Sequence, residues 1–273
     1  MTKTVAWFQC SAGVSGDMCL GALIAAGAPL TTLQNWLGEL GLQAQLTVEP
    51  VQKQGISAIK AHVNCAHEHQ HRHLSHIESL IDGAASFPQS VKEQSKKVFH
   101  RLAQAEAAVH NSTPEEVHFH EVGAADAIFD ICGTVAALYL LGIQELYFTP
   151  LPLSHGFIDC AHGRLPLPAP ATAKLLEGLK VFPLDVAGET VTPTGAALLS
   201  TLGTQKSLCP DFRLIGQGCG AGTKDFAHAN VLQVYLGETS TCSENLTQDE
   251  ITILTSALDD SNPEFLGGLW LLS

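Results

Sequence analysis

The amino-acid sequence predicts an α/β fold, in which helices flank a mixed β-sheet within a single large domain. Three observations support this class. The chain opens with a strand, a glycine turn and a helix; its middle holds two long helical patterns; and the remainder alternates strand-like and helical segments. Its 273 residues are enough to bury a sizeable core.

The first third of the chain supplies two helices and two strands. Residues 4–10 are typical of a buried strand, and an apolar helix is predicted from residue 17 to about residue 26. A second helix ends at Gly41 and has apolar residues at helical spacing, namely Leu33, Trp36, Leu37 and Leu40. Residues 57–65 alternate as in a half-buried strand, and this pattern places Lys60, His62 and Asn64 on the solvent side.

Two longer helices are predicted in the middle. Residues 88–110 form an amphipathic pattern that ends at Asn111, and residues 113–116 (Thr-Pro-Glu-Glu) have the composition of a capping box that begins a new turn. Residues 123–141 are apolar on nearly every side, which predicts a core helix.

The remainder alternates between the two kinds of element. Strand-like segments occupy residues 147–153, 213–216 and 231–236, and helical segments begin at Pro170 and Pro193. We divide the chain into a domain at residues 1–238, a polar linker at residues 239–250 and the start of a further domain at residues 251–273.

Charge and composition exclude several classes of function. Fourteen basic residues against 27 acidic ones leave a net charge of −13, which disfavours binding to nucleic acid. No apolar run is long enough for a signal peptide or a membrane span, so we expect a cytoplasmic protein with no membrane partner. The eight cysteines are scattered singly, which favours reduced thiols over disulfides or a zinc finger.

A histidine-rich segment is the strongest sign of metal binding. It holds His67, His69, His71, His73 and His76. Neutral imidazole is a favoured ligand of nickel, copper and zinc, and these residue types do not select among the three metals. If the chain is helical from Arg72 onward, His73 and His76 lie one turn apart and could chelate one ion together. The alternative is a solvated polar loop.

A second candidate site lies at the entry to the predicted core helix. It comprises His118, His120, Glu121, Asp126 and Asp130. The two aspartates share one helix face, and a carboxylate as deep in the apolar helix as Asp130 is costly without a partner, so we favour a metal or catalytic site. The alternative is that the acids favour the positive end of the helix and the histidines form local hydrogen bonds.

A third candidate is the turn before the first helix. Its residues Gly13, Ser15, Gly16 and Asp17 could present backbone N–H groups to a phosphate or carboxylate, although a tight turn explains the glycines equally well. For the glycine-rich residues 216–222 a turn between strands is at least as good an explanation. His155 and residues 162–164 could line a pocket, but lone histidines of this kind are more often structural.

Together these segments resemble the LarC family of nickel insertion proteins. Four motifs in order carry the resemblance: residues 11–23, residues 118–130, residues 162–170 and residues 192–197. Family members also tend to have a histidine-rich insert where residues 67–76 stand here. The likeness covers residues 5 to 238.

The resemblance implies an activity, a substrate and partners. The family inserts Ni²⁺ into pyridinium-3,5-bisthiocarboxylic acid mononucleotide, with CTP and Mg²⁺ or Mn²⁺, and so completes the nickel-pincer cofactor of lactate racemase. By this likeness the histidine-rich segment collects nickel. The second site then presents the metal to the substrate or removes the ring proton, and the turn at Gly13, Ser15, Gly16 and Asp17 lies near the substrate phosphate. Apo lactate racemase is an implied partner, and self-association stays open.

One departure from the family concerns the end of the chain. Residues 251–273 resemble only the beginning of the family's C-terminal domain, which cannot fold from so few residues. We therefore expect this chain alone to bind nickel without CTP-dependent insertion. Two other functions stay open: a nickel store or metallochaperone, and, as the weakest reading, a metal-dependent hydrolase.

Overall fold

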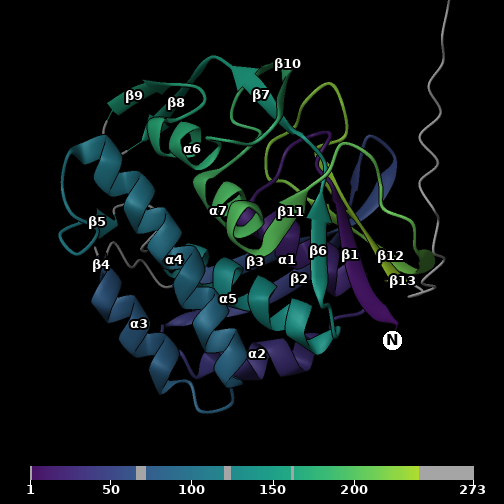
Figure 1. The fold of residues 1–273 in the computed structure, drawn as a ribbon, viewed down its shortest axis with the longest axis horizontal. Coiled ribbons are helices and arrows are strands. Elements are labelled where there is room, and N and C mark those ends of the chain that lie inside the picture. The colour runs from purple at the N-terminus through teal and green to yellow at the C-terminus, as the bar shows by residue number, and fades with distance from the viewer. Residues whose placement is uncertain (1, 66–71, 120–123, 161–162, 240–273) are drawn as a thin grey trace, which may run out of the picture. The chain divides into compact units, whose positions relative to one another are not determined.

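The centre of the fold is a seven-stranded mixed sheet, seen in a computed structural model that describes residues 2–65, 72–119, 124–160 and 163–239 (Figure 1). In order across the sheet the strands are β11 (Gly203–Gln205), β6 (Glu145–Phe148), β1 (Lys3–Gln9), β13 (Val231–Thr239), β12 (Arg213–Ala221), β3 (Ile56–Cys65) and β2 (Ala44–Lys53). β1 runs parallel to β6 and antiparallel to β13, so the predicted mixed sheet is confirmed.

Seven helices accompany the sheet in the described part of the chain. They are α1 (Gly16–Ala25), α2 (Leu30–Gly38), α3 (Leu74–Gly83), α4 (Gln89–His110), α5 (Ala125–Leu140), α6 (Pro170–Leu175) and α7 (Pro193–Leu202). α1 packs on β3, β12 and α5, and α4 packs on α5, α6 and α7, so α1 and α5 lie between the sheet and α4 (Figure 1). One hydrophobic core joins these layers.

Three short strand pairs lie outside the main sheet. β7 (Leu151–His155) pairs with β10 (Val181–Ala187), and β8 (Phe157–Cys160) pairs with β9 (Gly163–Pro166). β4 (Arg72–His73) pairs with β5 (His118–Phe119).

Several predicted boundaries need correction. The long helices at residues 88–110 and 123–141 are confirmed as α4 and α5, but the strand predicted at residues 147–153 is two strands, β6 and β7, in different sheets. The expected helix does not begin at Arg72, because Arg72 and His73 are extended and α3 starts at Leu74. Residues 113–116 make only a single turn, in which the Glu116 carboxylate accepts a 3.4 Å hydrogen bond from the Thr113 N–H.

The glycine-rich residues 216–222 are not a turn. Most of them belong to strand β12, against which α1 packs backbone to backbone. A Cβ atom on Gly218 would lie 2.0 Å from the carbonyl oxygen of Ala22, and one on Gly220 would lie 2.0 Å from that of Met18. The glycines are therefore explained by the close approach of a helix to a strand.

Residues Met1–Thr241 form one compact unit, and the second unit, Cys242–Ser273, lies outside the described residues. The division predicted at residues 239–250 therefore stays a prediction. Among the described helices, none combines the length and apolar character needed to cross a membrane.

Candidate functional site

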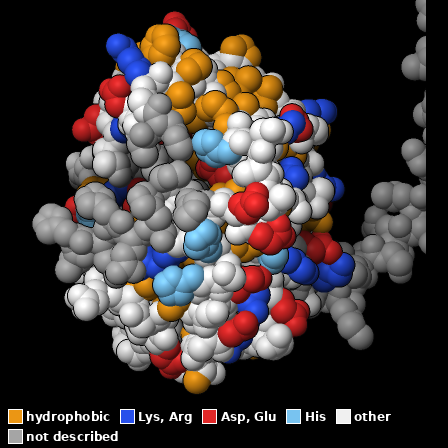
Figure 2. All heavy atoms as spheres, turned by 90° about the vertical axis from the view of Figure 1, so that its left-hand side faces the viewer, with side chains coloured by type: hydrophobic (Ala, Val, Ile, Leu, Met, Phe, Trp, Pro, Cys, Tyr) orange, Lys and Arg blue, Asp and Glu red, His pale blue; other side chains and the backbone are white. Residues whose placement is uncertain are grey.

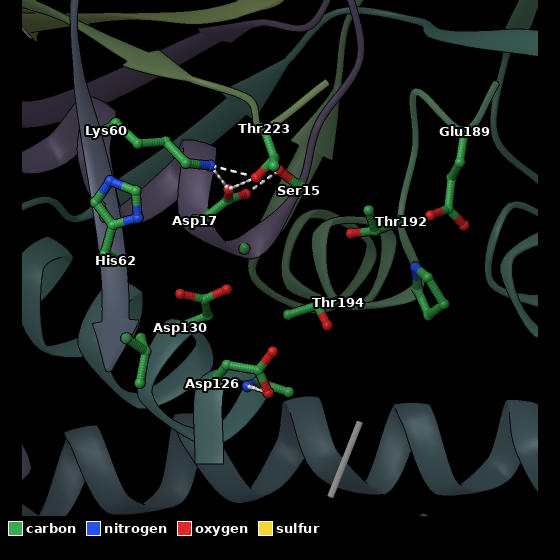
Figure 3. A pocket seen from close by; sticks show the side chains of 15 residues that line it. Ser15, Asp17, Lys60, His62, Asp126, Asp130, Glu189, Thr192, Thr194 and Thr223 are labelled. Carbon is green, nitrogen blue, oxygen red and sulfur yellow. Dashed lines mark hydrogen bonds and ion pairs between the residues drawn. The ribbon is translucent and has the colours of Figure 1, made fainter. Parts of the chain in front are cut away.

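A polar cavity of about 370 Å³ lies where four segments meet: the turn before α1, strand β3, the start of α5 and the start of α7 (Figure 3). Ser15, Gly16 and Asp17 line it from the first segment, and Asp126 and Asp130 line it from α5. The cavity thus brings together some of the residues from two of the three candidate sites that the sequence predicts.

Two glycines hold the turn against the start of α7. Val14 forms an isolated parallel bridge with Val191, and its N–H donates a 2.9 Å hydrogen bond to the carbonyl oxygen of Thr190. Gly13 has a φ of +120°, and a Cβ there would lie 2.0 Å from the same Thr190 oxygen. A Cβ on Gly195 would lie 2.5 Å from the Val14 carbonyl oxygen. These contacts place the first turns of α1 and α7 beside one cavity.

A network of paired charges and hydroxyl groups occupies the β3 side of the cavity. The Asp17 carboxylate forms an ion pair with Lys60 and accepts a hydrogen bond from the Ser15 hydroxyl. The Lys60 ammonium also donates to Thr223 Oγ1 at 2.6 Å, and this hydroxyl lies 3.3 Å from Asp17 Oδ2. Lys60 is only 7% exposed, so these partners compensate for the burial of its ammonium group.

The opposite wall holds a carboxyl group in a different situation. Asp130 is half-buried, and its Oδ1 atom is buried with no hydrogen-bond partner among the described residues. Burial raises the pKa of Asp130 well above its usual value, the charges of Asp17 and Asp126 add to this shift, and Lys60 opposes it. Asp126, one helical turn earlier, is exposed and accepts a 2.8 Å hydrogen bond from the Ala127 N–H.

The start of α7 closes the cavity on its third side. Thr192 caps this helix by accepting a 3.2 Å hydrogen bond from the Gly195 N–H, and Pro193 occupies the first turn. Glu189 and Pro193 also line a second cavity of about 210 Å³, whose walls include Val109, Ile158 and Leu165. Apolar side chains gather at the top of the face in Figure 2, where Figure 1 places β8, β9 and α6.

Only part of the histidine-rich segment that is predicted to bind nickel lies within the residues that the structure describes. His67, His69 and His71 lie outside the described residues, as do His120 and Glu121. His73 precedes α3, and His76 is an exposed residue of its first turn, so the two do not form a helical i, i+3 pair of the kind expected. Within the described ranges, no three histidine, cysteine or acidic side chains are arranged to hold a metal ion.

The β4–β5 pairing connects the two histidine segments, which the sequence analysis treated separately. His73 stands opposite His118 in the antiparallel register, and Arg72 stands opposite Phe119. The backbone at the end of the histidine-rich segment is therefore hydrogen-bonded to the beginning of the second candidate site.

Lys60 and Thr223 were missed as site residues. The alternation in residues 57–65 assigned Lys60 to solvent, but this side of β3 faces the start of α1 and the cavity (Figure 3). A signal was present in the sequence, because Asp17 in the first turn of an otherwise apolar helix needs a partner of opposite charge.

Comparison with known proteins identifies relatives over almost the whole chain. A family model described as nickel insertion protein matches residues 6–271. A protein of Geotalea daltonii is 47% identical over 269 residues, covering 97% of this chain and 68% of its own length, and one of Synechocystis is 44% identical over 285 residues, covering 97% and 67%. Both relatives are named for nickel insertion.

A third relative is named more specifically. The pyridinium-3,5-bisthiocarboxylic acid mononucleotide nickel insertion protein of Desulfitobacterium hafniense is 42% identical over 263 residues, which cover 95% of this chain and 65% of the relative. The chain thus spans about two thirds of the length of these relatives. No solved structure matches. The chain belongs to the family of nickel insertion proteins.

Proposed function

We propose that this chain takes up Ni²⁺ and, together with the C-terminal part that the longer relatives have, inserts it into pyridinium-3,5-bisthiocarboxylic acid mononucleotide, which yields the nickel-pincer cofactor of lactate racemase. The polar cavity is the proposed reaction site. One observation carries this assignment: the cavity holds an acceptor atom, Asp130 Oδ1, that is buried without a hydrogen-bond partner among the described residues. A buried carboxyl group of this kind costs stability, and such costs concentrate at functional sites.

Nickel reaches the substrate from oxygen and nitrogen donors in this proposal. Asp126 and Asp130 line the cavity, and His118, His120 and Glu121 precede α5 in the sequence. Oxygen and imidazole ligands hold a divalent nickel ion less strongly than two thiocarboxylate sulfurs and a carbon, so the metal is able to leave them for the product. The arrangement suits a transfer site better than a storage site.

Insertion also needs a proton acceptor. When the nickel–carbon bond forms, the ring carbon gives up its hydrogen as a proton, and the carbon's electron pair passes to the metal. Asp130 in its ionised form is suited to take this proton, because burial raises the pKa of its carboxyl group and so strengthens the carboxylate as a base. Either this residue or one of the histidines of the second candidate site performs the step.

The histidine-rich segment is proposed to collect the metal. His67, His69, His71, His73 and His76 provide the ligands, and the pairing of β4 with β5 supports a short path for the ion. The path runs from the end of this segment to the residues that precede α5. Asp126 and Asp130, which belong to α5 itself, line the cavity.

Two parts of the proposed reaction involve regions or proteins other than the described residues. We propose that the CTP-dependent step, with Mg²⁺ or Mn²⁺, requires the C-terminal part that the longer relatives have, and that apo lactate racemase receives the product in the cytoplasm. The chain covers 68% of the length of one of these relatives and 65% of another.

Nickel titration and cofactor maturation test the proposal together. Calorimetry on the metal-free chain should detect nickel uptake that is lost when residues 67–76 are deleted. In the full-length form, His118→Ala or Asp130→Asn, whichever removes the proton acceptor, should lower the insertion rate by about 100- to 10,000-fold, the usual contribution of a general base. Unchanged maturation by both variants, with normal nickel uptake, would favour a nickel store and refute the insertase.

A further inference from the structure

The charged side chains of the polar cavity are unevenly distributed. Among the described residues that line it, Lys60 is the only lysine or arginine, whereas four carboxyl groups line it: those of Asp17, Asp126, Asp130 and Glu189. Figure 3 shows Lys60, Asp17, Ser15 and Thr223 gathered on one side of the cavity and Asp126 on another. The cavity therefore has one cationic corner in a largely acidic wall.

A mononucleotide that enters this cavity carries several negative charges, on its phosphate and on its two thiocarboxylates. Like charges repel strongly in a partly desolvated site, so the acidic wall disfavours the phosphate. The ring substituents are less disfavoured at that wall, because a divalent cation can lie between them and the carboxylates. The phosphate has no such bridging ion and is therefore best placed at the cationic corner.

We propose that Lys60, together with the hydroxyl groups of Ser15 and Thr223, recognises the substrate phosphate and so sets the orientation of the substrate, with the ring directed toward Asp126 and Asp130. This inference rests on the proposed function for the identity of the ligand. Its support lies in the described contacts, because Lys60 is 7% exposed, is fixed by Asp17 and Thr223, and lies beside the first turn of α1.

Asp17 has a defined part in this arrangement. Its carboxylate neutralises Lys60 in the absence of substrate, and it is itself held by the Ser15 hydroxyl and by a 2.9 Å hydrogen bond from the Met18 N–H. A phosphate must share the ammonium group with this carboxylate. Asp17 thus keeps the buried lysine charged and oriented at the cost of some affinity for the anion.

The test compares binding of the mononucleotide with binding of the same molecule lacking its phosphate, measured by calorimetry without nickel. Wild-type protein should prefer the phosphorylated form. Lys60→Met should weaken binding of that form by about 10- to 100-fold, the range for a hydrogen bond to a charged group, and leave binding of the dephosphorylated form unchanged. Lys60→Arg should restore part of the preference, because it keeps the charge.

Lys53 provides a matched control. It forms an ion pair with Asp225 at 2.6 Å and approaches the carbonyl oxygen of Thr223 at 3.5 Å, so it contacts the same loop as Lys60, but it does not line the cavity. Lys53→Met should therefore leave both affinities unchanged. If Lys60→Met does not fold, the double variant Lys60→Met/Asp17→Asn removes both charges of the pair and is expected to lose the same preference.

Asp17→Asn should change the affinity for phosphate in the opposite direction from Lys60→Met. It removes the carboxylate that competes for Lys60, so the affinity for inorganic phosphate should rise, which a purely structural role of the ion pair would not produce. Wild-type protein that binds neither probe, or Lys60→Met that retains the preference for the phosphorylated form, overturns the inference. The two outcomes differ in what they refute: wild-type protein that binds neither probe also counts against the proposed substrate, whereas retained preference in Lys60→Met refutes the phosphate assignment alone.

Discussion

The two sides of the polar cavity differ in whether their carboxyl groups have partners among the described residues. On the β3 side, Asp17 is matched by Lys60 and by the hydroxyl groups of Ser15 and Thr223. On the α5 side, Asp130 has an oxygen without a hydrogen-bond partner among the described residues, and its pKa is raised by burial and by neighbouring acids. Within the described ranges, the first arrangement is satisfied by side chains of the protein, whereas the second leaves an acceptor that a ligand or a proton can complete.

This difference predicts which substitutions should mainly lower stability and which should mainly lower activity. Removing one member of the satisfied pair should cost stability, because the remaining charge is left buried. Removing the charge of Asp130 should cost activity and spare stability, as is common where a site is strained for function. The predictions below test this contrast.

The largest effect on stability is expected on the paired side. Lys60→Met leaves Asp17 without its cation and should lower the free energy of unfolding by about 2–4 kcal/mol, near the lower end of the range for breaking a buried pair because Asp17 keeps some exposure. Urea denaturation measures this change. The double variant Lys60→Met/Asp17→Asn should recover part of the loss, and a single variant as stable as wild type would show that the pair contributes nothing.

A smaller loss is expected where the two sides meet. A Cβ on Gly16 would lie 2.6 Å from Asp130 Oδ2 and 2.8 Å from Thr194 Cγ2, so Gly16→Ala should destabilise the protein by about 1–3 kcal/mol through overpacking. Gly83 is the control, since it also lies at a helix terminus but a Cβ there meets nothing within 4 Å. Thermal unfolding should show Gly83→Ala to be neutral or stabilising, and equal losses in both variants would contradict the steric argument.

Asp130, on the α5 side of the cavity, should make the free energy of unfolding depend on pH. The pKa of Asp130 is higher in the folded than in the unfolded chain, so the folded state binds more protons and stability falls as pH rises from the unfolded value toward the folded one. Asp130→Asn removes this loss. Its melting temperature relative to wild type should therefore increase with pH above about 4, and a difference that is constant across pH would mean that Asp130 titrates normally.

The smallest effect is expected at Asp126. This residue is exposed and accepts a hydrogen bond from the N–H of Ala127, which an asparagine side chain can also accept. Asp126→Asn should change the free energy of unfolding by less than about 0.5 kcal/mol, as is usual for exposed positions. A large loss would place Asp126 with Lys60 among the residues that hold the site together.

The sequence predicted elements well where the hydrophobic pattern was long and uniform. α4 and α5 lie within a few residues of the expected bounds, and they end before Asn111 and Gly142, which have φ values of 50° and 68°. β2 was missed, because in residues Ala44–Lys53 only Leu46 is buried and Pro50 interrupts the strand pattern. The start of β12 was predicted at residues 213–216, but its continuation was taken for a turn because its glycines serve a contact with α1 that is distant in sequence.

The candidate site was predicted in parts, and its assembly was not. Asp17 and Asp130 were each singled out, and the structure places both beside one cavity. Their common location depends on the bridge between Val14 and Val191 and on the packing of α1 against α5, which are contacts that no local pattern reports. Lys60 was missed because strand alternation distinguishes two faces but does not say which one a helix terminus covers.

The short pairing of β4 with β5 has a consequence for how the family can vary. The histidine-rich segment begins after Cys65, the last residue of β3, and its far end is fastened at Arg72 and His73 by β5. The described residues that line the cavity all lie outside the sequence between these anchor points. If the proposed function is correct, the number of histidines there can change without replacing any residue of the described cavity wall.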